Sequence, residues 1–350
     1  MKYPALLAFS DLLPQLDDFD TIIDVRSEAE YEEDHIPGAI NCPVLNNAER
    51  AEVGTLYKQV GPFEAKKRGA VLVARNIASH LDTVFHDTPR DWKPLVYCWR
   101  GGNRSGSMAH ILAKIGWPSI QLDGGYKEYR RHVNAALAEL PAAFGFQVIC
   151  GPTGSGKSRL LQTLDALGAQ VLDLEDLAAH RGSVLGNIPD APQPSQKMFE
   201  SRVWDKLHRF DPARPVYVES ESKKIGNLRV PEALMERMRA SPCINLQLSR
   251  ENRVALLMQE YAHFVHAPSQ LNTQLSYLTQ LHGREKIARW QAMAEQGNIA
   301  SLVHALLEEH YDPAYQRSIA HNFTQFERAP LLQVESIDVP AFKRAAATLL

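Results

Sequence analysis

The chain has 350 residues, 45% of them hydrophobic and 23% charged, which is ordinary for a globular protein and long enough for two domains. Its formal net charge of -3 excludes a module that binds nucleic acid through bulk positive charge, so any RNA contact must come from local clusters of cations. Four cysteines without a CxxC pair exclude a disulfide framework and a zinc knuckle, and we find neither a signal peptide nor a membrane-spanning apolar run, so we expect a cytoplasmic protein.

The first part of the chain alternates short apolar segments with amphipathic ones. Short apolar runs predict buried strands, and strands joined by helices predict a parallel sheet with crossover helices. A turn at Asp123-Gly124-Gly125 precedes the last of these helices. The strands are expected at 21–25, 95–97 and 119–122, and the helices at 105–115 and from 126 to about 140.

A second α/β pattern follows a joint at Pro141-Ala142-Ala143. We therefore expect one domain over residues 1–138 and another over 139–350. Beyond Arg250 the pattern is mostly helical to about residue 310, which gives the second domain a helical C-terminal part. Its strands are expected at 146–150, 171–174, 215–219 and 244–248, and its first helix from 158 to about 167.

Cys98 lies in a loop between a predicted strand and a predicted helix. Loop N–H groups, nearby arginines and a helix N-terminus favour the thiolate, the nucleophile that accepts a sulfur or selenium atom. A lone cysteine is more often a small buried hydrophobe, which suits Cys150 within an apolar strand better than Cys98. We expect Cys98 to be catalytic and the following residues to surround its terminal chalcogen: Trp99, Arg100, Gly101, Gly102, Arg104 and Ser105.

The spacing C-x5-R-S has a second interpretation. Cysteine-dependent phosphatases use the same arrangement, in which the loop binds a phosphate dianion. The phosphatase pattern usually has a histidine just before the cysteine, where this chain has Tyr97. Spacing alone leaves phosphatase chemistry open.

The segment GPTGSGKS fits the P-loop pattern G-x-x-x-x-G-K-[ST] at every fixed position, after an apolar strand and before a helix. Glycines let backbone N–H groups turn inward around an anion, and the helix N-terminus adds partial positive charge. A chance match has odds of roughly 1 in 100 in a chain this long. The predicted phosphate-binding residues are Gly151, Thr153, Gly154, Ser155, Gly156, Lys157 and Ser158.

Acidic and basic residues follow the other strands of this second domain. Asp173 and Glu219 stand at strand ends, where a carboxylate can hold Mg²⁺ through water or orient a substrate. Glu175 and Asp176 follow Asp173, and a role in capping the next helix is as good an explanation for them as a role in binding Mg²⁺ or substrate. Whether the P-loop requires Mg²⁺ stays open. Arg250 and Arg253 follow the fourth strand and are candidates to close over phosphates.

Three further segments carry a resemblance to rhodanese domains. They are Asp24-Val25-Arg26-Ser27 with Tyr31 and 35–41, the loop from Cys98 to Ser105, and Leu122-Asp123-Gly124-Gly125-Tyr126. An insertion containing 54–59 and 63–67 replaces the usual short connection. A rhodanese-like parallel-sheet domain with this insertion, followed by a P-loop NTPase-like α/β domain, resembles the tRNA 2-selenouridine synthase family over essentially the whole chain.

The resemblance implies a transferase that acts on tRNA. Members of that family replace the sulfur of wobble 2-thiouridine with selenium from selenophosphate, and are associated with geranylation of that sulfur by geranyl diphosphate. By resemblance, Cys98 carries selenium as a selenylsulfide, the P-loop binds a diphosphate, and the S-geranyl group makes sulfur a better leaving group. The implied partners are tRNA and an enzyme that supplies selenophosphate, with no tightly bound cofactor and no membrane.

Two local features suit a tRNA partner. Trp99 beside Arg100 is placed to stack on a flipped-out base. Candidate contacts to tRNA phosphates are Lys223, Lys224, Arg229, Arg237 and Arg239, although a solvated charged face explains each of them equally well.

Two other functions remain as alternatives. The first is a small-molecule P-loop kinase or ATPase fused to a rhodanese sulfurtransferase, in which Asp173 positions an acceptor hydroxyl. The second is a non-catalytic regulator whose rhodanese module senses redox state or binds a partner. The presence of Cys98 with both arginines argues against an inactive module.

Overall fold

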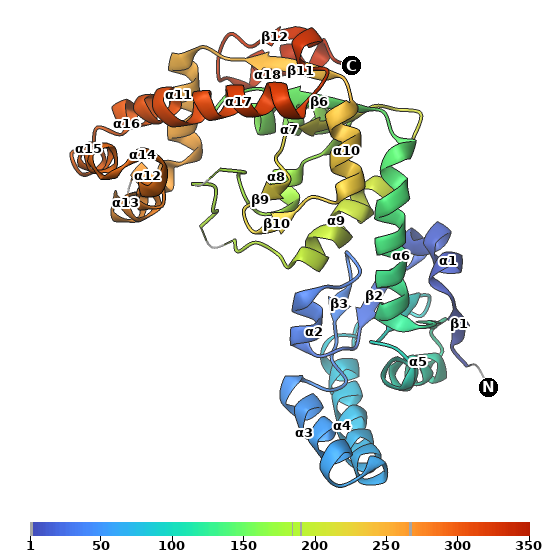
Figure 1. Cartoon of the computed structure of the whole chain (residues 1–350). Coiled ribbons are helices and arrows are strands. Elements are labelled where there is room, and N and C mark those ends of the chain that lie inside the picture. Colours follow the sequence, from blue (N-terminus) through green and yellow to red (C-terminus); the bar gives the residue numbers. More distant parts are fainter. Residues whose placement is uncertain (1–2, 184, 190, 266–267) are drawn as a thin grey trace. The chain divides into compact units, whose positions relative to one another are not determined.

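The computed structural model describes residues 3–183, 185–189, 191–265 and 268–350. The chain divides into two compact units, Met1–Ala136 and Leu137–Leu350. The division falls inside helix α6 (Gly125–Glu139), and the expected joint after it forms a short 3₁₀ turn, η2 (Leu140–Ala143). Each unit has its own sheet and core (Figure 1). Over the described ranges, no helix is long and apolar enough to cross a bilayer.

Within the described residues of the first unit, five parallel strands form a sheet in the order β1-β5-β4-β2-β3. The strands are β1 (Ala5–Leu7), β2 (Thr21–Asp24), β3 (Ile40–Asn41), β4 (Pro94–Tyr97) and β5 (Ile120–Leu122). All four residues of β4 are buried, as expected of an apolar strand in the middle of a parallel sheet. The α/β fold predicted for this half is confirmed. The sequence missed β1 and β3, which have three residues or fewer.

Helices α2 and α5 connect consecutive strands of this sheet as crossover elements, and α6 follows the last strand, β5. The rhodanese-type insertion forms a pair of packed helices, α3 and α4, rather than a loop. Asn46 caps α3 in a reciprocal pair with Glu49, and Pro62 opens α4, so each helix has a strong start signal. The helices are α1 (Phe9–Leu12), α2 (Glu28–Glu33), α3 (Asn47–Gln59), α4 (Pro62–Thr83), α5 (Asn103–Ile115) and α6.

The second unit, in the part that the structure describes, has a five-stranded parallel sheet in the order β12-β11-β6-β8-β7. The strand that leads into the P-loop, β6, is its centre. The strands are β6 (Phe146–Cys150), β7 (Gln170–Leu172), β8 (Val216–Glu219), β11 (Cys243–Gln247) and β12 (Leu331–Gln333). An α/β fold was expected here too, and it is confirmed. The edge strand β12 and a short hairpin, β9 (Lys224–Ile225) and β10 (Leu228–Arg229), were not predicted.

The C-terminal helices extend further than the sequence indicated. Helical structure runs to Asn322 rather than to about residue 310, and α18 then follows β12. Helices α11, α12, α13, α15 and α16 contribute side chains to a separate apolar core around Trp290, Leu275 and Leu302. The helices are α7 (Lys157–Ala166), α8 (Leu174–Leu177), α9 (Gln196–His208), α10 (Glu232–Ala240), α11 (Arg250–Glu260), α12 (Ala262–Val265), α13 (Pro268–Ser276), α14 (Thr279–His282), α15 (Arg284–Glu295), α16 (Ile299–Leu306), α17 (Asp312–Asn322) and α18 (Val339–Ala347).

Candidate functional site

The cysteine loop begins where β4 ends and reaches the start of α5 within five residues. Cys98 is buried, with 1% of its surface exposed. Gly101 and Gly102 have φ angles of 68° and 70°. This left-handed backbone conformation is one that residues with a side chain rarely adopt. This pair turns the chain back into α5, so the loop closes tightly around the sulfur.

Ser105 and Gln121 make the polar contacts next to the sulfur. The Ser105 hydroxyl donates to Cys98 Sγ across 3.3 Å. Gln121 Nε2, from β5, donates to Ser105 Oγ and to the Gly102 carbonyl, each at 3.0 Å. The sequence placed Ser105 in the loop but missed Gln121, because no local pattern connects a strand residue to a loop preceding it in the chain.

The first turn of α6 supports the loop from behind. The backbone N–H of Tyr126 donates to the Cys98 carbonyl at 2.7 Å, and that of Lys127 donates to the Trp99 carbonyl at 3.1 Å. Gly125 is required for this close approach, because a Cβ there would lie 2.3 Å from the Cys98 carbonyl oxygen. The Trp99 and Tyr126 rings stack at 5.2 Å, which leaves Trp99 half-buried against the protein.

The two loop arginines have different surroundings. Arg100 is exposed, whereas Arg104 donates to Glu30 Oε2 at 3.0 Å, and Arg50 reaches the same oxygen at 3.0 Å. Burial acts to raise the pKa of Glu30, but the hydrogen bond and charge of Arg104, with help from Ser27 and Arg50, lower it overall. Arg104 is thus paired with a carboxylate. The sequence predicted Arg104 near the chalcogen but did not predict this partner.

The residues of the first rhodanese-like segment, which begins at Asp24, hold other parts of the fold in place. Arg26 is buried and pairs with Asp24 at 2.6 Å, and its guanidinium lies 4.0 Å from the centre of the Tyr126 ring. The Tyr126 hydroxyl donates to Asp34 Oδ2 at 2.7 Å. Loss of one partner of such a buried ion pair typically costs about 3–5 kcal/mol. Arg26 and Asp34 therefore hold the Tyr126 ring in place beside the cysteine loop.

The P-loop in the second unit joins β6 to α7. Lys157 Nζ donates to the Gly151 carbonyl at 2.9 Å, so the lysine folds back over the loop. A Cβ at Gly151 would lie 2.8 Å from the Leu246 carbonyl, and one at Gly156, whose φ is 88°, would lie 2.5 Å from the Phe342 ring. Close packing requires glycine at both positions, and the left-handed backbone of Gly156 requires it there as well.

Ser155 offers the loop an additional donor. Its side chain is buried, and Oγ has no hydrogen-bond partner among the residues that the structure describes. A buried hydroxyl without a partner costs free energy unless a ligand or water supplies one. The loop glycines, Lys157 and this hydroxyl fit a phosphate group, in keeping with the predicted anion site.

Carboxylates converge beside the last residue of the loop. Ser158 Oγ donates to Glu175 Oε2 at 3.1 Å, and the Glu175 backbone N–H donates to Glu219 Oε1 at 2.9 Å. Asp173 accepts from the Asp176 N–H at 2.9 Å and caps α8. The predicted strand at 171–174 therefore ends two residues earlier, and the helix cap is Asp173 rather than its acidic neighbours.

Glu221 was missed by the sequence, although it belongs to the same cluster. A Cβ at Gly182 would lie 2.7 Å from Glu175 Oε1 and 2.9 Å from Glu221 Oε1, so these two carboxyls face the same point. Burial and then Glu175 raise the pKa of Glu221 to about 8. Burial also raises the pKa of Asp173 to about 6 and that of Glu219 well above its ordinary value. Glu221 therefore holds its proton near neutral pH.

Residues of the same cluster are the candidate protein ligands for Mg²⁺. Ser158 and Glu175 are the available ligands next to a bound phosphate, with Glu219 behind them. Over the described part of the chain, no group of three or more histidine, cysteine, aspartate or glutamate side chains has the geometry to hold a metal ion. A bound Mg²⁺ would consequently draw most of its ligands from phosphate and water, as is common for this ion.

Arg253 braces the P-loop rather than standing free above it. Its guanidinium donates to the Thr153 carbonyl at 2.9 and 2.7 Å and forms an ion pair with Asp312 at 2.5 Å. Arg250 lies more openly, 3.4 Å from Asp312 and 3.9 Å from Glu308. Of the two predicted arginines, Arg253 contacts the P-loop itself, whereas Arg250 pairs with Asp312 and Glu308.

The residues proposed for tRNA phosphates fall into two groups. Lys223 is exposed, and Lys224 and Arg229 are paired opposite each other on the exposed positions of the β9–β10 hairpin. Arg237 and Arg239 lie on α10, where Arg237 donates to the Phe144 carbonyl. The hairpin forms the more compact cluster of exposed cations.

Two family models match the chain, one in each unit. A family model for the AAA domain of tRNA 2-selenouridine synthase matches residues 144–329, and a rhodanese-like domain model matches residues 9–132. Both motifs described above lie within these ranges.

Three curated proteins, each named tRNA 2-selenouridine synthase, resemble the chain along much of its length. The protein from Nitrosomonas europaea is 37% identical over 69% of this chain, and the match covers 63% of the relative. The protein from Sulfurovum sp. is 31% identical over 89% of this chain and 93% of the relative, and that from Marinobacter nauticus is 31% identical over 84% and 87%. With its rhodanese-like and P-loop units in this order, the chain belongs to the tRNA 2-selenouridine synthase family.

Proposed function

We propose that this protein is a transferase that converts wobble 2-thiouridine in tRNA to 2-selenouridine, with selenophosphate and geranyl diphosphate as co-substrates and an S-geranyl intermediate. The observation that carries the proposal is the presence of two loops of different chemistry, each with hydrogen-bond donors that suit an anion. One presents a buried thiol beside a hydroxyl donor, and the other presents a glycine-rich nest with a lysine. Each loop suits one of the two steps.

The P-loop serves the geranyl step in this proposal. The sulfur of 2-thiouridine attacks the first carbon of geranyl diphosphate, the carbon–oxygen bond breaks, and diphosphate leaves with the electron pair while the base loses its N3 proton. Lys157 and the loop N–H groups stabilise the charge that develops on the diphosphate. The Ser155 hydroxyl, buried and without a partner among the described residues, is available to a phosphate oxygen.

Cys98 serves the selenium step. The S-geranyl group turns the sulfur into a leaving group, so a selenium nucleophile can add to C2 of the base as geranylthiolate departs. We place the selenium on Cys98 before this exchange, as a selenylsulfide whose formation from selenophosphate requires a two-electron oxidant and releases phosphate. After its terminal selenium has displaced geranylthiolate from C2, a thiol cleaves the Se–S bond of the C2–Se–S–Cys98 adduct, which releases 2-selenouridine and leaves a disulfide on Cys98. Ser105 then donates its hydrogen bond toward the charged chalcogen, and Gln121 keeps that hydroxyl in place.

A kinase or ATPase is the second candidate, because Ser158, Glu175 and Glu219 are linked by hydrogen bonds at the end of the P-loop, where nucleotide enzymes hold Mg²⁺. Against it, Asp173, the expected acceptor-positioning residue, is occupied as the cap of α8. ATP turnover in the absence of tRNA, lost in Lys157→Ala, would favour this candidate.

The direct test is mass spectrometry of tRNA nucleosides from cells that lack this protein. We expect 2-selenouridine to disappear and 2-thiouridine to remain, with recovery when the intact gene is restored. Unchanged 2-selenouridine in the deleted strain would refute the proposed function.

A further inference from the structure

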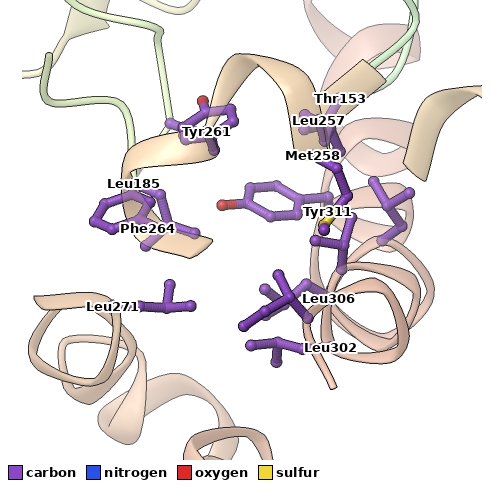
Figure 2. A pocket seen from close by; sticks show the side chains of 14 residues that line it. Thr153, Leu185, Leu257, Met258, Tyr261, Phe264, Leu271, Leu302, Leu306 and Tyr311 are labelled. Carbon is purple, nitrogen blue, oxygen red and sulfur yellow. The ribbon is translucent and has the colours of Figure 1, made fainter. Parts of the chain in front are cut away.

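An apolar pocket in the second unit adjoins the P-loop (Figure 2). About 550 Å³ of space lies within it when the open solvent at its mouth is included. Most of its wall is aliphatic or aromatic, and none of the residues that line it carries a formal charge. The lining residues are Thr153, Leu185, Leu257, Met258, Tyr261, Phe264, Leu271, Leu302, Leu306 and Tyr311, with Ser183, Ile299, Val303 and Leu307.

The pocket is continuous with the phosphate loop. Thr153 belongs to the loop and also lines the pocket. Leu257 lines the pocket and packs on the loop, because a Cβ at Gly154 would lie 2.9 Å from its side chain. One turn earlier on α11, Arg253 holds the Thr153 carbonyl with two hydrogen bonds. A single helix therefore positions the anion site and forms one wall of the apolar site.

The P-loop and the adjoining apolar pocket together indicate which kind of ligand would fit. A molecule that fills both places needs an anionic head for the loop and an apolar tail for the pocket. A nucleobase fits the pocket poorly, because its ring nitrogens and exocyclic groups would lose their hydrogen bonds to water. Each buried methylene of a hydrocarbon tail strengthens binding by a factor of roughly four.

We propose that the pocket holds the hydrocarbon tail of a prenyl diphosphate whose diphosphate lies in the P-loop, and that Leu271 limits the length of the tail. The inference rests on the proposed function and names the binding site of its co-substrate. Figure 2 shows Leu271 and Leu302 on the side of the pocket opposite Thr153 and Leu257. A tail that starts at the loop therefore runs toward Leu271, on α13, and ends there.

The test measures binding of inorganic pyrophosphate, geranyl diphosphate and the longer farnesyl diphosphate to the full chain and its variants. In the wild type we expect geranyl diphosphate to bind at least about tenfold more tightly than pyrophosphate, because of the tail. Leu271→Trp fills the far end and should weaken geranyl diphosphate roughly tenfold while pyrophosphate binding is unchanged. Leu271→Ala opens the far end and should shift the preference toward farnesyl diphosphate.

Leu275→Ala is the matched control. Leu275 is buried one turn further along the same helix but does not line the pocket, so its loss should lower stability without changing the preference for tail length. Equal affinity for pyrophosphate and geranyl diphosphate in the wild type would overturn the inference, as would a Leu271→Trp variant that still binds geranyl diphosphate normally. If geranylation of tRNA nevertheless proceeded, the proposed function would stand and only the pocket assignment would fail.

Discussion

The hydroxyl of Ser105 lies 3.3 Å from the sulfur of Cys98 and donates a hydrogen bond to it. A hydroxyl donor stabilises negative charge on sulfur, and it would do the same for a selenium atom held in that place. The donor does not depend on a mobile side chain, since Gln121 fixes the hydroxyl from the neighbouring strand. A hydroxyl donor is thus held next to Cys98 Sγ, while the thiol itself donates to the Arg100 carbonyl at 3.7 Å.

Cys98→Ser is expected to abolish selenium transfer and leave the fold intact. The change removes the nucleophile but little volume, and a serine hydroxyl can still pair with Ser105. Cys42→Ser is the control: burial raises the pKa of the Cys42 thiol to about 12, so this cysteine stays protonated and should be dispensable for transfer. The measurement is 2-selenouridine formed per enzyme from purified S-geranyl-2-thiouridine tRNA. Normal product from Cys98→Ser would remove the carrier role.

Lys157→Ala is expected to slow geranylation of 2-thiouridine tRNA by about 100-fold or more, because the cation that stabilises the departing diphosphate is lost. Selenation of supplied S-geranyl-2-thiouridine tRNA should be much less affected, since Cys98 lies in the other unit. Single-turnover product analysis with both tRNA substrates gives the two rates. Equal loss of both steps in a folded variant would show one shared site and contradict the division of labour.

Glu221→Gln is expected to change the dependence of stability on pH. Burial raises the pKa of Glu221 from its ordinary 4.5 to about 8, so the folded protein holds a proton that the unfolded chain releases. This contribution to stability is complete below about pH 4.5 and is lost as pH rises to about 8. The variant should therefore gain melting temperature relative to wild type as pH rises from 5 to 8.5. A difference in melting temperature that does not vary with pH would contradict the assignment.

Lys224→Ala tests how tRNA is held. The protein lacks bulk positive charge, so affinity for tRNA should depend on a few local phosphate contacts and fall with rising salt. If the β9–β10 hairpin supplies one of them, the variant should bind more weakly at low salt, with a slope of log affinity against log salt reduced by about one. Lys66, exposed on α4 in the other unit, offers a control substitution that should leave the slope unchanged. Affinity of the wild type for tRNA that does not change with salt concentration would contradict binding through phosphate contacts.

The sequence was informative where structure is locally encoded. Apolar runs such as 146–150 predicted the strands of both sheets, and GPTGSGKS predicted the loop between β6 and α7. Three edge strands, β1, β3 and β12, were missed, and they have only two or three residues each, which leaves little pattern to recognise. The hairpin of β9 and β10 has two residues on each side, which is too short for a period to be recognised.

The site was less predictable than the fold because many of its contacts are long-range. Glu30 holds Arg104 from a different helix, and Asp312 holds Arg253 from a helix far along the chain. The tail pocket has no sequence signature at all, since its wall combines loop residue Thr153 with leucines from α11, α13 and α16. Such leucines are what any helical core contains.

The contact between Gly156 and Phe342 has a consequence for how the second unit can be divided. The ring of Phe342, on the last helix, lies where a side chain at position 156 would be, and Arg253 ties the other side of the loop to Asp312. A fragment that ended after α10 would keep all eight residues of the P-loop motif and lose both supports. A fragment that keeps both supports of the loop must therefore extend through α18, and a substitution at Phe342 changes the packing of the P-loop.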